Sequence, residues 1–228
     1  MREAIPATAT ASALRLVVTA ERLFAVHGID GVSLRQIAAE SGSGNNSAVH
    51  YHFGSKDALI EAIFGHRLPQ LTRERQMLAS RCDPDDVRAR LEAQYLPVFA
   101  MAEAPDNRYV SFVEQLQRRA ASGAFFAELP RDWQRSNDDF HADMHELLGA
   151  VDEPLRALRI HDAQSICLHA AADRERAVDA HAEVAPFVLF VSSILDGVTG
   201  FLSAPASPAT LRHVRRADAM APPALRLL

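Results

Sequence analysis

Apolar residues recur every three or four positions along most of this chain, which is the spacing of an α-helix that buries one face. The first such segment covers residues 12–27, and its apolar positions are Leu16, Ala20, Leu23 and Phe24. Gly28 follows directly, where a left-handed C-terminal cap would end the helix. No stretch alternates apolar and polar residues between turn signals as a strand would. The pattern therefore predicts an all-α protein.

A second, shorter helix is predicted to begin at Ser33. Gln36 comes three positions later, which is the spacing of a capping box. The inner face of this helix is expected to consist of Leu34, Ile37 and Ala38. The sequence Ser-Gly-Ser-Gly at 41–44 then ends the helix and turns the chain.

A third helix, too short to be stable alone, follows that turn. Asn45 is a favourable N-cap for it. Val49 and Phe53 are expected to anchor it in the core, and Gly54 breaks it. Three helices with a tight turn between the last two predict a helix-turn-helix unit.

The remainder of the chain keeps the helical period. Ser55 caps a fourth helix, which is expected to continue past Pro69 with a kink. Longer helices are predicted over residues 84–102, 108–122, 131–148, 154–181 and 184–203. The segment from Ala204 onward is rich in proline and should be irregular, apart from a short helix near 211–217.

These elements predict four parts: a flexible arm over 1–11, a helix-turn-helix domain over 12–54, a larger helical domain over 55–203 and a Pro-rich tail over 204–228. The 228 residues are 48% hydrophobic, which is enough for a substantial core. Residues 1–67 hold six Lys/Arg and six Asp/Glu, so the net charge of −5 lies in residues 68–228. That charge argues against a protein that coats nucleic acid, but a neutral first part with several histidines can present a local positive face.

Compartment signals are consistent with a soluble protein. Cys82 and Cys167 are far apart and lack metal-ligand spacing, as expected of free thiols in a reducing cytoplasm. No apolar run reaches the roughly 18–20 residues that span a bilayer, and the first residues lack the apolar stretch of a signal peptide. We therefore expect a cytoplasmic protein without a membrane partner.

The third predicted helix carries side chains suited to reading DNA. A helix-turn-helix unit places its second helix in the major groove, with the N-terminal side chains against base edges. Asn46, Ser47 and His50 are the predicted base contacts, because amide, hydroxyl and imidazole groups can pair with bases. Asn46 and His50 lie four residues apart and so share one face of the helix.

Side chains around this helix are suited to phosphates. Lys56 opens the fourth helix, where its charge opposes the helix dipole unless an anion lies there as well. The predicted contacts to the DNA backbone are Ser33, Arg35, Tyr51, His52 and Lys56. Taken singly, Tyr51 or His52 is also compatible with packing, and Lys56 with an ordinary solvated lysine. The prediction depends on the order of capped helix, glycine turn, short helix and Ser-Lys-Asp helix start.

Three segments of this region resemble the TetR family of bacterial transcriptional regulators: AERLFAVHG at 20–28, VSLRQIA at 32–38 and VHYHFGSKDAL at 49–59. The turn before the third helix is about one residue longer than in the family, and His50 stands where the family most often has Tyr. The resemblance implies a homodimeric repressor that binds a palindromic double-stranded DNA operator and releases it when a small-molecule effector binds the larger domain. It implies an effector-binding and dimerisation role for that domain. We expect no enzymatic activity and no cofactor.

The segment 184–202 is a candidate for the dimer interface, because it is apolar on more than one face and contains small residues for close approach. The candidate contact residues are Phe187, Val191, Ile194, Leu195, Val198 and Phe201. The resemblance implies a four-helix interface formed with residues 155–172 of each subunit. A central core helix within a monomer is the alternative reading of the same pattern.

An apolar effector pocket is predicted between the helices of the larger domain. Its candidate lining residues are Tyr95, Phe99, Phe112, Leu116, Phe125, Phe126, Trp133, Phe140 and Met144. Residues of this kind more often form the ordinary core of a helical domain, and no charge pattern among them identifies a ligand.

A metal site offers an alternative function. His141 and His145 are four residues apart with Asp143 and Glu146 close by, a spacing that can bind a divalent cation, and His161 and His169 are possible further ligands. This set would suit a metal-binding helical sensor or a metalloenzyme. The His-Glu-x-x-His motif of metalloproteases is absent, as are a phosphate-binding glycine loop and a Gly-x-Ser-x-Gly nucleophile turn.

Overall fold

Helices make up the regular structure of the protein in a computed structural model that describes residues 11–42, 48–119, 125–126 and 128–214. No strand occurs among these residues, which confirms the predicted all-α class. The helices are α1 (Ala11–His27), α2 (Leu34–Glu40), α3 (Ala48–His52), α4 (Lys56–Ala79), α5 (Val87–Met101), α6 (Tyr109–Gln117), α8 (Arg131–Leu147), α9 (Leu155–Asp179), α10 (Phe187–Ser203) and α11 (Pro208–Val214).

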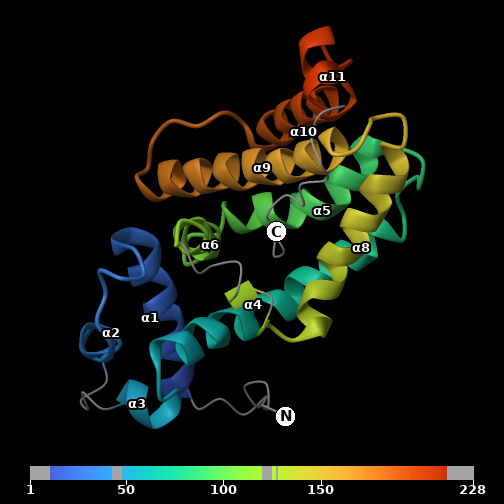
Figure 1. Cartoon of the computed structure of the whole chain (residues 1–228). Coiled ribbons are helices and arrows are strands. Elements are labelled where there is room, and N and C mark those ends of the chain that lie inside the picture. The colour runs from blue at the N-terminus through green and yellow to red at the C-terminus, as the bar shows by residue number, and fades with distance from the viewer. Residues whose placement is uncertain (1–10, 43–47, 120–124, 127, 215–228) are drawn as a thin grey trace.

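The three N-terminal helices gather at one end of the molecule, and α4 leads away from them toward α5 and α8 (Figure 1). We call α1–α3 the head and α5–α10 the body, with α4 joining them. In the body, α9 lies across α6 and packs along α10. Helix α6 also packs on α1 more extensively than on any other helix, so the head rests directly on the body.

The caps of the head form as the sequence predicts. Gly28 ends α1 with φ 74°, a left-handed conformation that favours glycine, and its amide bonds to Phe24 O at 3.0 Å. The Ser33 hydroxyl caps α2 by accepting from Gln36 N at 3.1 Å. The reciprocal half of the predicted capping box is replaced, because the Gln36 side chain donates to Glu40 instead. The predicted N-cap Asn45 lies outside the described residues.

Several body helices begin or end at positions other than those predicted, and local groups explain them. Helix α5 begins at Val87, later than the predicted 84, because the Asp86 carboxylate accepts from two amides of its first turn. Helix α10 begins at Phe187 because Pro186 at its N-cap disfavours a helical residue before it. Helix α11 begins at Pro208, where the Ser207 hydroxyl caps the first turn.

Helix α6 is shorter than predicted and ends at Gln117. The Arg119 amide bonds to Leu116 O three residues back instead of four. The chain therefore leaves the α-helix through a tighter turn. Helix α4, by contrast, continues through Pro69 as predicted.

One hydrophobic cluster extends through head and body, from Leu16 in α1 to Leu202 in α10. It includes residues on both sides of residue 54, which is the end of the helix-turn-helix domain predicted from the sequence. Val49 of α3 and Ile60 of α4 are both fully buried in this cluster. A displacement of the body helices should therefore also shift residues of the head, because the two share one packed core.

A buried ion pair ties three helices together where the head meets the body. Glu21 of α1 is 1% exposed and accepts two hydrogen bonds from Arg67 of α4, at 2.7 and 2.8 Å. The same carboxylate accepts from the Arg108 backbone amide, at the N-cap of α6, at 3.1 Å. Burial lowers the pKa of Arg67, but the hydrogen bond to Glu21 and the negative charges nearby together outweigh it, and the net shift is upward.

A second buried carboxylate completes the N-terminus of α6. Glu175 of α9 accepts from the amides of Val110 at 3.2 Å and Ser111 at 3.0 Å. Burial raises the pKa of Glu175 to about 7, against the hydrogen bonds from Ser111 and Val110, which lower it. One end of α6 is thus held by an acid from the head and an acid from the body.

No single helix among the described residues is long and apolar enough to cross a membrane. Helices α10 and α11 meet that test only when taken together, across a bend of 65°.

Candidate nucleic-acid interface

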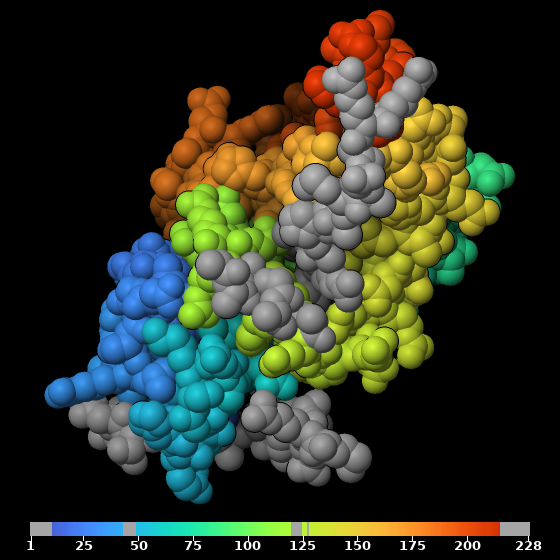
Figure 2. Space-filling view, in the orientation of Figure 1, coloured from blue at the N-terminus to red at the C-terminus, as the bar shows by residue number. Residues whose placement is uncertain are grey.

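Helix α3 is anchored on one side and exposed on the other. Val49 is 0% exposed, and Phe53 is half-buried against the core. Tyr51 is 84% exposed and His50 is also exposed. The helix lies at the edge of the molecule, where the cyan surface of this region projects in Figure 2. Its anchored side fixes it to the head, so its other side is free to meet a partner.

A turn locks the end of this helix and orients His50. Gly54 has φ 76°, and its amide bonds to His50 O at 3.1 Å. The His50 Nδ1 atom lies 3.0 Å from Gly54 O. Because a carbonyl oxygen only accepts, Nδ1 carries the hydrogen in this contact, and Nε2 is left for a partner.

The other two predicted base contacts, Asn46 and Ser47, lie outside the described residues. They remain predictions from the sequence.

The predicted backbone contacts lie on the same end of the molecule as α3. Ser33 and Arg35 are exposed at the start of α2, and the Ser33 hydroxyl keeps its own hydrogen free to donate while its oxygen caps the helix. Tyr51 and His52 stack edge to face, with ring centroids 5.0 Å apart. His52 is half-buried, since it also contacts the Phe53 ring.

Lys56 has a structural contact that the sequence did not reveal. Its Nζ atom donates to Ile29 O at 2.9 Å and so ties the start of α4 to the loop between α1 and α2. The sequence shows no signal for this contact, because the two residues are 27 positions apart. An ammonium group has three hydrogens, so two remain for a phosphate. Lys56 is also the only lysine in the chain.

The predicted effector-pocket residues pack against one another in the core. Most are at most 2% exposed: Tyr95, Phe99, Phe112, Leu116, Phe126, Phe140 and Met144. Phe125 and Trp133 are half-buried against the same cluster. Ring contacts such as Tyr95–Phe140, with centroids 5.7 Å apart, fill the space between the helices. The structure thus brings these residues together, but as a packed core.

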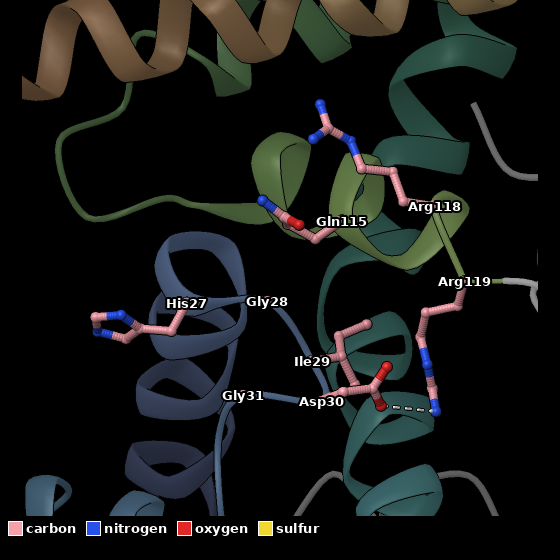
Figure 3. A pocket seen from close by; sticks show the side chains of 8 residues that line it. All are labelled: His27, Gly28, Ile29, Asp30, Gly31, Gln115, Arg118 and Arg119. Carbon is pink, nitrogen blue, oxygen red and sulfur yellow. Dashed lines mark ion pairs between the residues drawn. The ribbon is translucent and has the colours of Figure 1, made fainter.

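An open cavity of about 590 Å³ lies elsewhere, where the head meets the body. Its walls come from the connection after α1 and from the end of α6 (Figure 3), and the lining residues are His27, Gly28, Ile29, Asp30, Gly31, Gln115, Arg118 and Arg119. Asp30 and Arg119 form an ion pair across it at 3.2 Å. The two walls are far apart in sequence, so the pattern of residues could not predict this cavity.

The structure corrects half of the predicted dimer contacts. Val191, Leu195 and Val198 are at most 7% exposed, because they face α5 and α9 of their own chain. Phe187, Ile194 and Phe201 are half-buried. The large exposed apolar side chains of α9 and α10 are Leu158, Ile166, Val188 and Leu189. The inner face of this segment is therefore part of the core of its own chain. Its outer face remains available to a partner.

Several side chains proposed as metal ligands have other partners. Asp143 pairs with Arg90 at 2.6 Å, and His145 pairs with Glu153 at 3.0 Å. Within the part of the chain that the structure describes, no three His, Cys, Asp or Glu side chains form a group that could hold a metal ion. Nothing in this geometry favours the alternative function.

Comparison with known proteins points to one family. Residues 16–63 match the family model described as bacterial regulatory proteins, tetR family. Among solved structures, the chain matches the crystal structure of Mycobacterium smegmatis AmtR at 18% identity and a TM-score of 0.39, over 95% of this chain and 99% of that one. The comparison with curated proteins gives no match.

Proposed function

We propose that this chain, whose residues 16–63 match the model of the tetR family of bacterial regulatory proteins, is a homodimeric repressor of that family that leaves its DNA operator when a small molecule binds the body. The observation that carries this proposal is the presentation of α3. Val49 anchors the helix at 0% exposure while Tyr51, two residues on, is 84% exposed. A short helix held in this way is suited to enter the major groove.

Reading and positioning are assigned to different side chains. We assign base contacts to Asn46, Ser47 and His50, and backbone contacts to Ser33, Arg35, Tyr51, His52 and Lys56. The exposure of His50, Tyr51 and Arg35 supports this division. Phosphate contacts set affinity and its salt dependence, whereas base contacts set sequence preference.

The dimer uses the outer faces of α9 and α10 in this proposal. The exposed apolar side chains Leu158, Ile166, Val188 and Leu189 support it, because isolated monomers rarely leave such groups together on neighbouring helices. Gly197 and Gly200 have open space around them, which allows a second helix to approach closely. A two-fold axis here would present two heads to one face of a duplex, with half-sites about 34–36 Å apart.

Release of DNA follows from linkage between body and head. An effector shifts the equilibrium only by as much as it prefers the form that does not bind DNA. The ties of α6 to Glu21 and Glu175 support this coupling, because any displacement of α6 moves a residue of α1. The protein acts in this scheme by binding rather than by catalysis.

The experiment is a fluorescence anisotropy titration with duplexes that flank the protein's own gene, at several salt concentrations. The full chain should bind one duplex well above random DNA, with log K falling linearly with log salt. Lys56→Ala should weaken binding to every duplex alike and lower the salt slope by roughly one. His50→Ala should instead change the preference among operator variants.

Matched controls lie far from α3. His181→Ala and Arg212→Ala change an exposed histidine between α9 and α10 and an exposed cation of α11, and neither should alter DNA binding. Absence of binding to any flanking duplex, even at low salt, would refute the proposed function. Identical behaviour of the Lys56 and His50 variants would refute the division of roles.

A further inference from the structure

One guanidinium lies in the interior of the body without an acid beside it. Arg75 of α4 is 3% exposed. Its Nε donates to Gln94 O at 2.9 Å, while its Nη2 atom is buried and has no hydrogen-bond partner among the described residues. Burial lowers the pKa of Arg75 to about 10; the neighbouring Tyr95 and Tyr109 oppose this shift, and the nearby Arg90 contributes to it. Arg75 thus faces two tyrosines and another cation.

Three other largely buried arginines have an acidic partner, whereas Arg159, at 8% exposure, donates to Leu202 O. Arg67 pairs with Glu21 at 2.7 Å, and Arg90 pairs with Asp143 at 2.6 Å. Arg174 is paired with Glu103. Removing a charge from water without a partner costs several kcal/mol, so a protein that keeps one has a use for it.

A second donor without a partner lies beside Arg75. The Tyr109 hydroxyl is buried and has no acceptor among the described residues, and Tyr109 and Arg75 act on each other electrostatically. Aromatic rings surround both donors. Phe64 meets the Tyr109 ring edge to face at 5.9 Å, and Phe140 meets Tyr95 in the same way at 5.7 Å. Two donors between aromatic walls match a flat ring that carries an acceptor-rich, negatively charged group.

We propose that the interior between α4, α5 and α6 binds an aromatic carboxylate, whose oxygens accept from Arg75 Nη2 and Tyr109 OH. This inference rests on the proposed function, of which it names the effector class. The carboxylate supplies the charge that Arg75 lacks, and the ring displaces aromatic contacts of the closed core. Binding therefore selects a more open arrangement of the body helices.

The site is placed to act on the head. Arg75 lies 19 residues after Lys56 on the same helix, so α4 spans about 28 Å between the ligand and the turn beside α3. Tyr109 lies at the first turn of α6, where Glu21 of α1 accepts from the Arg108 amide. A ligand between these two residues parts two helices that both contact α1.

The test uses the full chain with benzoate and phenylacetate, beside their neutral counterparts benzamide and phenylacetamide. Thermal unfolding and calorimetric titration are measured at constant ionic strength. Sodium chloride alone serves as the control for a nonspecific anion effect. At least one carboxylate should raise the Tm and bind saturably, and its amide should bind at least about tenfold more weakly. Equal binding of the amides, equal stabilisation by chloride, or no response to either carboxylate would overturn the proposal.

Variants separate this role from a structural one. Arg75→Met should raise the Tm of the free protein, because a buried unpaired charge is replaced by an apolar chain of similar length, and should abolish the response to carboxylates. Tyr109→Phe should weaken the binding of the carboxylate several-fold. A fall in the Tm of Arg75→Met with an unchanged carboxylate response would make Arg75 merely structural and refute the site.

Arg159→Met is the matched control. Arg159 of α9 is 8% exposed and donates to Leu202 O near the end of α10, so it is not part of the proposed site between α4, α5 and α6, and its variant should respond to carboxylates as the parent does. DNA binding is measured separately on the same preparations. Operator binding without a carboxylate response refutes only this inference, whereas a carboxylate response without operator binding refutes only the proposed function.

Discussion

At the scale of single residues, burial decides what a charge contributes. Glu21 and Arg67 are largely buried and share two hydrogen bonds, whereas Arg22 and Glu40 form a pair of similar length on the surface. Buried pairs are costly to break, because the remaining partner is left without its counter-charge. Surface pairs contribute little, because water screens them.

We predict that Glu21→Gln lowers the free energy of unfolding by about 3 kcal/mol, since Arg67 keeps its charge and loses its partner. Urea denaturation measures the change. Glu40→Gln is the matched control and should leave stability nearly unchanged, and the double change Glu21→Gln with Arg67→Met should recover part of the loss. Equal effects of the two single changes would contradict this account of burial.

At the scale of elements, the caps fix where helices begin, and one of them also faces the proposed DNA. The Ser33 hydroxyl accepts from Gln36 N at the start of α2 and is exposed. The sequence predicted this cap from the spacing of Ser33 and Gln36. It could not place the contact of Lys56 with Ile29, because no local pattern links the two residues.

The two roles of Ser33 can be separated by substitution. Ser33→Ala should cost about 1 kcal/mol of stability and weaken DNA binding, because both the cap and the donor are lost. Ser33→Asp should keep the cap and the stability, since a carboxylate is favourable at a helix N-terminus, and yet weaken DNA binding by repelling phosphate. Thermal unfolding and anisotropy measure the two effects. Ser207→Ala removes the cap of α11 and is the control, which should leave DNA binding unchanged. An unaltered DNA affinity of the Ser33→Asp variant would contradict the proposed contact between Ser33 and phosphate.

At the scale of the whole molecule, α6 connects the head to the body. Its N-terminal amides are held by Glu21 from α1 and Glu175 from α9. Burial raises the pKa of Glu175 to about 7 from its ordinary value of 4.5. The folded protein therefore retains a proton between these values that the unfolded chain has lost.

This difference predicts a pH dependence of stability. Between about pH 4.5 and 7 the folded state binds more protons at Glu175, so raising the pH through this window lowers the free energy of unfolding, by on the order of 3 kcal/mol in total. Glu175→Gln cannot titrate and should remove this contribution. Urea denaturation of both proteins from pH 4 to 8 measures the difference. Parallel curves for the two proteins would show that Glu175 does not titrate in this window.

Assembly is the second prediction at this scale. Leu189 is 61% exposed on α10, and Leu189→Glu should place a charge in the proposed dimer interface. Light scattering after gel filtration should then report a monomer, and operator affinity should fall because two heads no longer bind together. Met77→Glu changes another exposed apolar residue, on α4, and should remain dimeric. A Leu189→Glu protein that stays dimeric would place the interface elsewhere.

The sequence by itself determined the helical class, the caps at Gly28 and Ser33, the end of α3 at Gly54 and the likeness of residues 16–63 to a family model, because these follow from spacing and conformation over neighbouring residues. Only the tertiary structure decided which face of α10 is buried, since Val191 and Val188 are equally apolar and differ only in what packs on them. The same holds for Arg75, whose lack of an acidic partner depends on how α4, α5 and α6 meet around it. Helical period specifies that a face is buried, but the partner of each buried group is set by residues far away in the chain.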